Sequence, residues 1–171
     1  MHGAAHEAGA VIEAKCYGAV LASHDDTTAA HVDTSKANGV TFAEFPTTLE
    51  AAQACRANDI DVMMGAPNLI RGSSHSGNVS AVELAEHGLL DIVSSDYVPS
   101  ALLLSAFRLA KIWNDLPRAM ACVSENPAAA AGLTDRGRLA VGWRGDVLRI
   151  GLMGVDTPVL RGVWNQGVQV S

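Results

Sequence analysis

Four short hydrophobic runs of this chain each end in polar side chains, and a stretch of helix-forming residues follows every run. The runs with their polar ends cover residues 19–26, 40–46, 62–68 and 92–97. This alternation repeats roughly every 20–25 residues and is typical of parallel strands joined by helices. Because parallel strands with right-handed crossovers place their carboxyl ends at one edge, we expect the polar ends to meet there.

The same pattern predicts the other elements of the chain. Helices are expected over residues 4–16, 27–38, 47–57, 79–87, 100–113 and 116–131, with a polar loop at 71–78. After Gly132, short β-type runs broken by glycines occupy 138–142, 146–150, 159–164 and 167–170. We therefore expect an α/β domain over residues 1–134 and a small β appendage over residues 135–171. Four strand–helix units do not close an eight-stranded barrel of about 250 residues, so the pattern leaves open a half barrel or another small α/β domain.

Composition narrows the classes of partner. Apolar residues make up 49% of the chain, charged residues 18%, and the net charge is −6. No cluster of Lys or Arg offers a track for a nucleic-acid backbone, so no nucleic-acid partner is expected. No membrane partner is expected either, because no stretch reaches the roughly 18–20 apolar residues that span a bilayer. The three cysteines lack paired spacing, and there is no secretory signal, which together predict a cytoplasmic protein with buried thiols.

Metal-binding residue types stand at the ends of three runs. His24 is followed by Asp25, and an imidazole there can bind a divalent metal while the neighbouring carboxylate orients it. Asp96 ends the fourth run and could bind the metal and take a proton from water. The alternative for these aspartates is to cap the helices that follow. Glu44 lies between two apolar residues, and the pattern leaves open a ligand role or a structural salt bridge.

The polar loop is dense in hydrogen-bond donors, which are Arg71, Ser73, Ser74, His75, Ser76 and Asn78. Loops rich in N–H and O–H groups beside a guanidinium hold phosphate oxygens, and two glycines let the backbone come close to a ligand. His75 could be a metal ligand, an acid–base group or a phosphate contact. The alternative is a solvated surface loop.

Taken together, these motifs resemble the amidohydrolase superfamily, and in particular its diphosphatases of the carbon–phosphorus lyase pathway. The stretches that carry the resemblance are 21–26, 43–52, 64–68 with 71–72, 74–81, 94–99, 126–128 with 131–133, and 136–137 with 144–147. The Glu-Phe-Pro-Thr-Thr run at 44–48 and the Ser-His-Ser-Gly-Asn run at 74–78 are the specific ones.

The resemblance implies a TIM barrel of which this chain supplies strands five to eight with their helices, followed by the last strands of a C-terminal β-sandwich. It also implies a zinc-like divalent metal, with His24 as the fifth-strand ligand and Asp96 as the eighth-strand ligand, acid and base. Glu44 occupies the place nearest the sixth-strand histidine of many members and is the third expected ligand. The implied substrate is a phosphorylated ribose phosphonate, alpha-D-ribose 1-methylphosphonate 5-triphosphate, which is hydrolysed with release of diphosphate. Its phosphates would bind to Arg71, Ser74, His75, Ser76 and Asn78.

Two motifs of the superfamily do not occur in this sequence, namely the first-strand His-x-His pair and the fourth-strand bridging Lys or Glu. We therefore expect a carboxyl-terminal half that is nearly inactive alone, with an amino-terminal half or a second copy of the chain as its partner. Two other hypotheses remain open. One is a different amidohydrolase activity, such as a deacetylase, a cyclic amidase or a deaminase. The other is a non-catalytic half that associates through unpaired strand edges.

Overall fold

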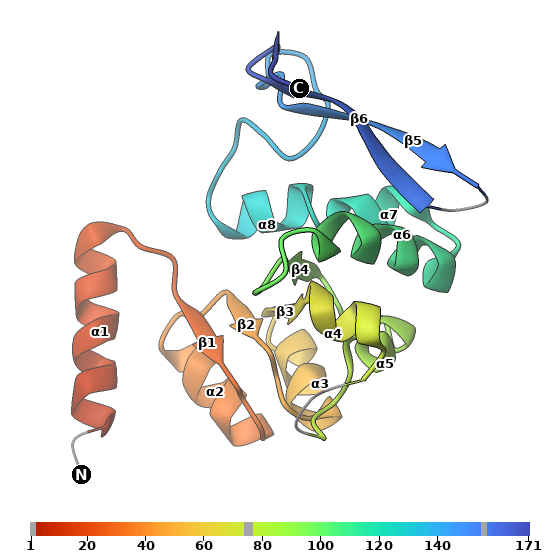
Figure 1. The fold of residues 1–171 in the computed structure, drawn as a ribbon. Helices are drawn as coiled ribbons and strands as arrows, with labels where there is room; N and C mark the ends of the chain where they lie inside the picture. Colours follow the sequence, from red (N-terminus) through yellow and green to blue (C-terminus); the bar gives the residue numbers. More distant parts are fainter. Residues whose placement is uncertain (1–2, 74–76, 155–156) are drawn as a thin grey trace. The chain divides into compact units, whose positions relative to one another are not determined.

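The computed structural model describes residues 3–73, 77–154 and 157–171. The elements are, in chain order, α1 (Gly3–Tyr17), β1 (Ala22–His24), α2 (Ala29–Ala37), β2 (Phe42–Glu44), α3 (Leu49–Ala57), β3 (Asp61–Gly65), α4 (Ala66–Arg71), α5 (Ala81–Glu86), β4 (Ile92–Ser94), α6 (Ala101–Trp113), α7 (Leu116–Ala121), α8 (Glu125–Ala130), β5 (Val147–Met153), β6 (Thr157–Asn165) and β7 (Val168–Gln169) (Figure 1). Two compact units divide the chain: the first is Met1–Met64 with Gly72–Asp91, and the second is Gly65–Arg71 with Ile92–Ser171. Within the described residues, no helix is long and apolar enough to cross a membrane.

Three parallel strands run through the first unit in the order β1, β2, β3. His24 at the end of β1 pairs in register with Glu44 at the end of β2. The helices that follow start at residues whose side chains accept a backbone N–H three residues on, which are Thr28 before α2, Thr48 before α3 and Ser80 before α5. Such caps satisfy donors that have no partner within the helix, so the sequence itself fixes where each strand–helix turn ends.

The turn after β1 and the turn after β2 have the same conformation. Each begins with a residue in the left-handed region, Asp25 with φ 60° and Phe45 with φ 56°. The two turns are bound to each other: Thr47 Oγ1 donates to Thr27 Oγ1 over 2.9 Å, and Thr48 Oγ1 donates to the Thr27 carbonyl over 2.7 Å. A repeated turn therefore ends both strands in the same way.

The core of the first unit lies between these strands and helices. Its side chains have at most 1% of their surface exposed and include Val32, Ala51, Ala52, Cys55, Ile60, Val62 and Leu84. Full burial of an aliphatic side chain as large as Leu or Ile contributes about 1.5–3 kcal/mol. This small, aliphatic core therefore contributes much of the stability of the first unit.

The second unit contains helices α4 and α6–α8 and strand β4. Val93 of β4 donates its N–H to the Cys122 carbonyl over 2.9 Å, which ties the strand to the end of α7. Between α6 and α7 the chain reverses at Asn114, whose φ is 51°, and Asp115 then accepts the Arg118 N–H as the cap of α7. Asp115 thus starts α7 directly after the turn that ends α6.

The three remaining strands form an antiparallel sheet in the second unit. Its order is β5, β6, β7, and β5 pairs with β6 along a hairpin that carries a bulge between Arg149 and Ile150 (Figure 1). Several side chains on this sheet and in the segment before it are large, apolar and more than half exposed, namely Leu139, Val141, Leu148, Leu152, Met153, Val168 and Val170. Exposed apolar patches of this kind are typical of surfaces that bind other protein segments.

The parallel strands, the separate antiparallel sheet and most helix positions confirm the α/β prediction. Three details were wrong. Residues 66–71, predicted to lead into a loop, form α4; residues 116–131 form two helices instead of one; and residues 138–142 form no strand. Cys16 is exposed, whereas Cys55 and Cys122 are buried as predicted. The domain boundary near residue 134 and the partial barrel stay predictions.

Candidate functional site

His24 and Asp25 form a polar pair at the end of β1. His24 Nδ1 lies 3.0 Å from Asp25 Oδ2, and the two side chains are 59% and 60% exposed. The ring of Phe45 meets the imidazole edge-on, with 5.2 Å between ring centroids. A carboxylate on Nδ1 leaves Nε2 as the nitrogen that could bind a metal, and it fixes the orientation of the ring. This geometry suits the ligand role predicted for His24.

Glu44 is the register neighbour of His24, one strand further along the sheet. Its side chain is half-buried, and among the described residues no cation forms an ion pair with it. The structural salt bridge that the sequence left open therefore has no partner in the described part of the chain. An imidazole and a carboxylate thus stand on neighbouring strands at the same edge.

Asp26 holds this edge together, a role that the sequence pattern did not reveal. Its side chain is 7% exposed, and Oδ2 accepts hydrogen bonds from Ser23 Oγ over 2.6 Å and Ser35 Oγ over 3.3 Å. Its carbonyl accepts the Thr47 N–H over 2.8 Å. Asp26 therefore joins β1, α2 and the turn after β2. The spacing of Ser23 and Asp26 around His24 is the one sequence signal that could have indicated it.

The predicted phosphate loop is described only at its ends. Ser74, His75 and Ser76 lie outside the described residues. Asn78 is exposed and precedes Val79, whose N–H donates to the Thr47 carbonyl over 3.0 Å. The carboxyl end of the loop therefore runs beside the turn after β2. The first unit thus contains His24 and Glu44 on neighbouring strands, and Asn78 in the segment beside the turn after β2.

Asp96 and Arg71 lie in the second unit and are linked through Tyr97. Asp96 has a left-handed backbone with φ 52°, and its Oδ1 accepts the Tyr97 N–H over 2.8 Å. Arg71, the last residue of α4, donates to the Tyr97 hydroxyl over 3.0 Å. A Cβ placed on Gly65 would lie 2.6 Å from Asp96 Oδ2, so the carboxylate occupies the space that a side chain at residue 65 would take. The sequence had not indicated Gly65 or Tyr97, although Tyr97 directly follows the predicted Asp96.

A divalent metal needs more donors at one place than either unit gathers in its described residues. Catalytic zinc sites in proteins use three protein ligands. The first unit supplies one imidazole and one carboxylate at its strand ends, and the second supplies the Asp96 carboxylate. Among the described residues, no three His, Cys, Asp or Glu side chains gather as a group that could hold a metal ion. The donor types fit a metal, but neither unit completes a site.

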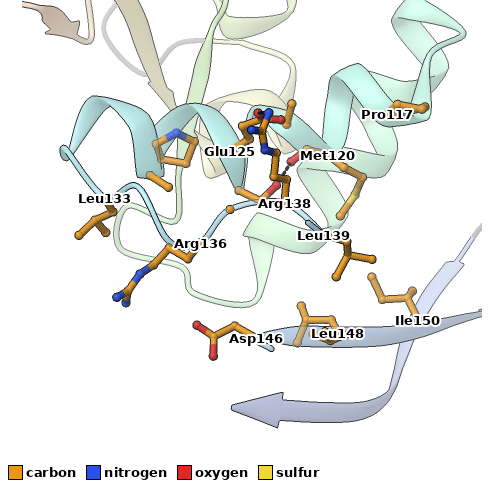
Figure 2. Close-up of a pocket in the computed structure, with 16 residues that line it drawn as sticks. Pro117, Met120, Glu125, Leu133, Arg136, Arg138, Leu139, Asp146, Leu148 and Ile150 are labelled. Carbon is orange, nitrogen blue, oxygen red and sulfur yellow. Dashed lines mark hydrogen bonds and ion pairs between the residues drawn. The ribbon is translucent and has the colours of Figure 1, made fainter. Parts of the chain in front are cut away.

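A separate cavity of about 860 Å³ lies in the second unit, between α7, α8, the segment 133–139 and β5 (Figure 2). Figure 2 shows Leu139, Leu148 and Ile150 along one side of the opening, and Glu125 in an ion pair with Arg138 at 3.0 Å. At the rim, hydrogen bonds from the Gln166 N–H and from Arg144 lower the pKa of Asp146, so its carboxylate is ionised at neutral pH. Among the residues that the structure describes, no predicted site residue lines this cavity.

A comparison with curated proteins gives one strong similarity. Over 131 residues, 75% of this chain, it is 55% identical to the alpha-D-ribose 1-methylphosphonate 5-triphosphate diphosphatase of Escherichia coli (strain K12). The matched stretch is 35% of that enzyme, so the chain spans about a third of the length of this curated relative. No protein-family model matches the chain.

Solved structures with the same fold include one of an uncharacterised protein and one of a molinate hydrolase. The first aligns with a TM-score of 0.66 at 17% identity, over 94% of this chain and 47% of its own. The second aligns with a TM-score of 0.59 at 15% identity, over 94% of this chain and 44% of its own. At these identities the likeness concerns the fold alone. The identity to the diphosphatase confirms the resemblance predicted from the sequence.

Proposed function

From 55% identity to an enzyme whose name states its reaction, we propose that this chain supplies part of the active site of a phosphoanhydride hydrolase. The substrate would be alpha-D-ribose 1-methylphosphonate 5-triphosphate, and hydrolysis would release diphosphate in phosphonate catabolism. The identity is the observation that carries this proposal. The polar ends of the strands support it, because they offer the residue types that such a reaction needs.

His24, Glu44 and Asp96 are the residues that we propose as ligands of a divalent metal, with zinc as the first candidate. When bound, such an ion would lower the pKa of water and polarise a phosphoryl oxygen. Asp25 would keep His24 oriented for this role through its bond to Nδ1, 3.0 Å long. The Asp96 carboxylate would accept the proton of the attacking water, as a general base does.

Phosphate binding would fall to Arg71, Ser74, His75, Ser76 and Asn78. A guanidinium donates two parallel hydrogen bonds to phosphoryl oxygens and offsets charge that develops in the transition state. The net charge of the chain is −6, so a triphosphate needs such a local cation to approach. Arg71 and Asp96 both contact Tyr97, Arg71 at its hydroxyl and Asp96 at its backbone N–H, which supports a shared substrate for the two residues.

The 171-residue chain on its own is expected to be inactive or nearly so. Of the three proposed ligands, His24 and Glu44 lie in the first unit and Asp96 in the second, and no group of three occurs in the described residues. The first-strand His-x-His pair and the fourth-strand bridging Lys or Glu that the resemblance implies would have to come from another polypeptide segment or another molecule. Metal binding by the isolated chain should therefore be weak.

The test is a chimera in which this chain replaces the matching stretch of the E. coli enzyme. We expect the chimera to release diphosphate from the ribose phosphonate triphosphate after addition of zinc, and the 171-residue chain alone to release almost none. Asp96→Asn in the chimera should lower kcat by at least about 100-fold, because it removes the general base. The matched control is Asp59→Asn, since Asp59 is also an aspartate with a left-handed backbone, φ 54°, and is not a site residue.

The alternatives predict other results in the same assay. A folded chimera that hydrolyses amides or cyclic ureides and leaves the triphosphate intact would replace the diphosphatase by another amidohydrolase activity. A chimera that folds and binds its zinc with no turnover of any of these substrates would favour the non-catalytic interpretation. Full activity of the 171-residue chain would contradict the proposed dependence on further ligands.

A further inference from the structure

Asp96 is held in one position by two features of the second unit. The Tyr97 N–H binds Oδ1 over 2.8 Å, and Oδ2 rests in the space left by the missing side chain of Gly65. Its backbone is in the left-handed region, at φ 52°, which aspartate adopts more readily than most residues with a side chain. These two contacts within the second unit therefore orient an exposed carboxylate.

Arg71 is fixed at the other end of the same group of residues. Arg108 of α6 donates to the carbonyl of Ile70 over 2.5 Å and so anchors the last turn of α4. The guanidinium of Arg71 then donates to the Tyr97 hydroxyl over 3.0 Å. Helix α4 starts directly after Gly65 and ends at Arg71, which contacts Tyr97. Tyr97 in turn contacts Asp96, whose carboxylate lies against Gly65, so these residues form a closed ring of contacts.

We propose that Tyr97 is a positioning residue that holds the Arg71 guanidinium on the segment that carries Asp96, so that Arg71 binds the phosphate chain whose hydrolysis Asp96 would assist. This inference rests on the proposed function, which makes Arg71 a phosphate ligand. Tyr97 performs the task with two different atoms. Its backbone N–H orients the acid, and its hydroxyl orients the cation. An arginine free to rotate would lose side-chain entropy on binding phosphate, and the hydroxyl reduces that loss.

Exposure of the tyrosine ring is consistent with a role at a binding surface. Tyr97 is 63% exposed, so its hydroxyl contributes little to the core. A buried tyrosine usually keeps its hydroxyl bonded for stability, whereas this one bonds an arginine at the surface. Removal of the hydroxyl should therefore change anion binding without changing the fold.

The experiment measures binding of inorganic triphosphate to the 171-residue chain at low ionic strength by calorimetry. Tyr97→Phe should raise Kd about two- to tenfold, the range for one hydrogen bond, and Arg71→Gln should raise it about tenfold or more. In the double variant, Tyr97→Phe should have no further effect, because its effect passes through Arg71. Thermal unfolding temperatures should stay the same, and Tyr17→Phe, which changes the only other tyrosine of the chain, is the matched control.

A spectroscopic signature separates positioning from a merely structural role. With 3-fluorotyrosine in place of both tyrosines, the ¹⁹F signal of residue 97 should shift as triphosphate is added, and that of residue 17 should not. The inference is overturned if Tyr97→Phe binds as the wild type does while Arg71→Gln does not, a result that leaves the proposed function standing. Additive effects of the two substitutions would overturn it as well. Equal binding by wild type and Arg71→Gln, or no binding by either, would overturn both the inference and the proposed phosphate site.

Discussion

Phe45 offers a test of the strain stored at the strand ends, because a bulky residue rarely adopts a left-handed backbone. Its φ is 56°, its N–H donates to the Met63 carbonyl over 2.9 Å, and its ring contacts the edge of His24. The left-handed conformation costs a residue with a side chain about 1–2 kcal/mol. Glycine at this position avoids that cost.

We therefore expect Phe45→Gly to be more stable than Phe45→Ala, which is the opposite of the usual order. The conformational cost of about 1–2 kcal/mol is partly offset, because glycine loses about 0.5–1 kcal/mol more backbone entropy on folding than alanine. The net advantage of glycine should be about 0.5–1 kcal/mol. Both variants lose the contact with His24, so its contribution of about 0.5–1.5 kcal/mol cancels in the comparison.

The assay is urea denaturation followed by circular dichroism, with amide hydrogen exchange of peptides from β2 and α3 to locate the change. Ala30→Gly serves as the control, because Ala30 lies on an exposed part of α2, where glycine should be less stable by up to about 1 kcal/mol. If Phe45→Gly is no more stable than Phe45→Ala, the backbone at residue 45 stores no strain, and the reasoning on the strand ends is wrong.

Three further predictions concern other parts of the molecule. Gly65→Ala places a Cβ 2.6 Å from Asp96 Oδ2, so the carboxylate must move. A catalytic group displaced by about 1 Å can lower the rate up to about 100-fold, so kcat of the chimera should fall while its unfolding temperature changes little. Partial desolvation and the nearby Asp91 carboxylate raise the pKa of Asp61 above 3.8 in the folded state. The folded state therefore binds the carboxyl proton of Asp61 more tightly than the unfolded state does, so the contribution of Asp61 to the free energy of unfolding falls as the pH rises above 3.8. Asp61→Asn should therefore be more stable than wild type at pH 7 and no more stable at pH 3, as urea denaturation would measure. Burial raises the pKa of the Cys55 thiol to about 11, so Ellman's reagent at pH 8 should react rapidly with exposed Cys16 alone, and with three thiols after unfolding.

The sequence predicted those parts of the fold that local chemistry determines. Thr28 and Thr48 cap helices that were predicted to begin beside them, because their hydroxyls reach backbone donors within the same turn. Helix α4 was missed because residues 62–68 were interpreted as a strand with a polar end. A proline in the first turn is compatible with a helix, and Arg108 from a distant helix anchors its last turn. That second condition depends on tertiary structure and has no local signal.

In the candidate site, too, some features could be predicted from local sequence and others depend on tertiary contacts. The positions of His24 and Glu44 follow from parallel topology, since a strand period of two and a common direction fix which residues end neighbouring strands. The burial of Asp26, the space above Gly65 and the bond from Arg71 to Tyr97 do not follow from it. Each of these depends on a partner more than eight residues away along the chain or in another element, and residue spacing carries no information about such partners.

At the ends of β1 and β2, the left-handed backbone conformation is found in the residues that orient the candidate ligands. The candidate ligands of the first unit do not have it. His24 and Glu44 still belong to regular strands, whereas Asp25 and Phe45, the residues directly after them, have left-handed backbones. Asp25 and Phe45 also contact the imidazole of His24. The orientation of the donor is therefore fixed by side chains whose conformations the buried core and the linked threonine turns must enforce. It follows that loosening these turns should disturb the direction of the imidazole before it disturbs the strands, so loss of metal affinity should precede loss of structure as urea is added.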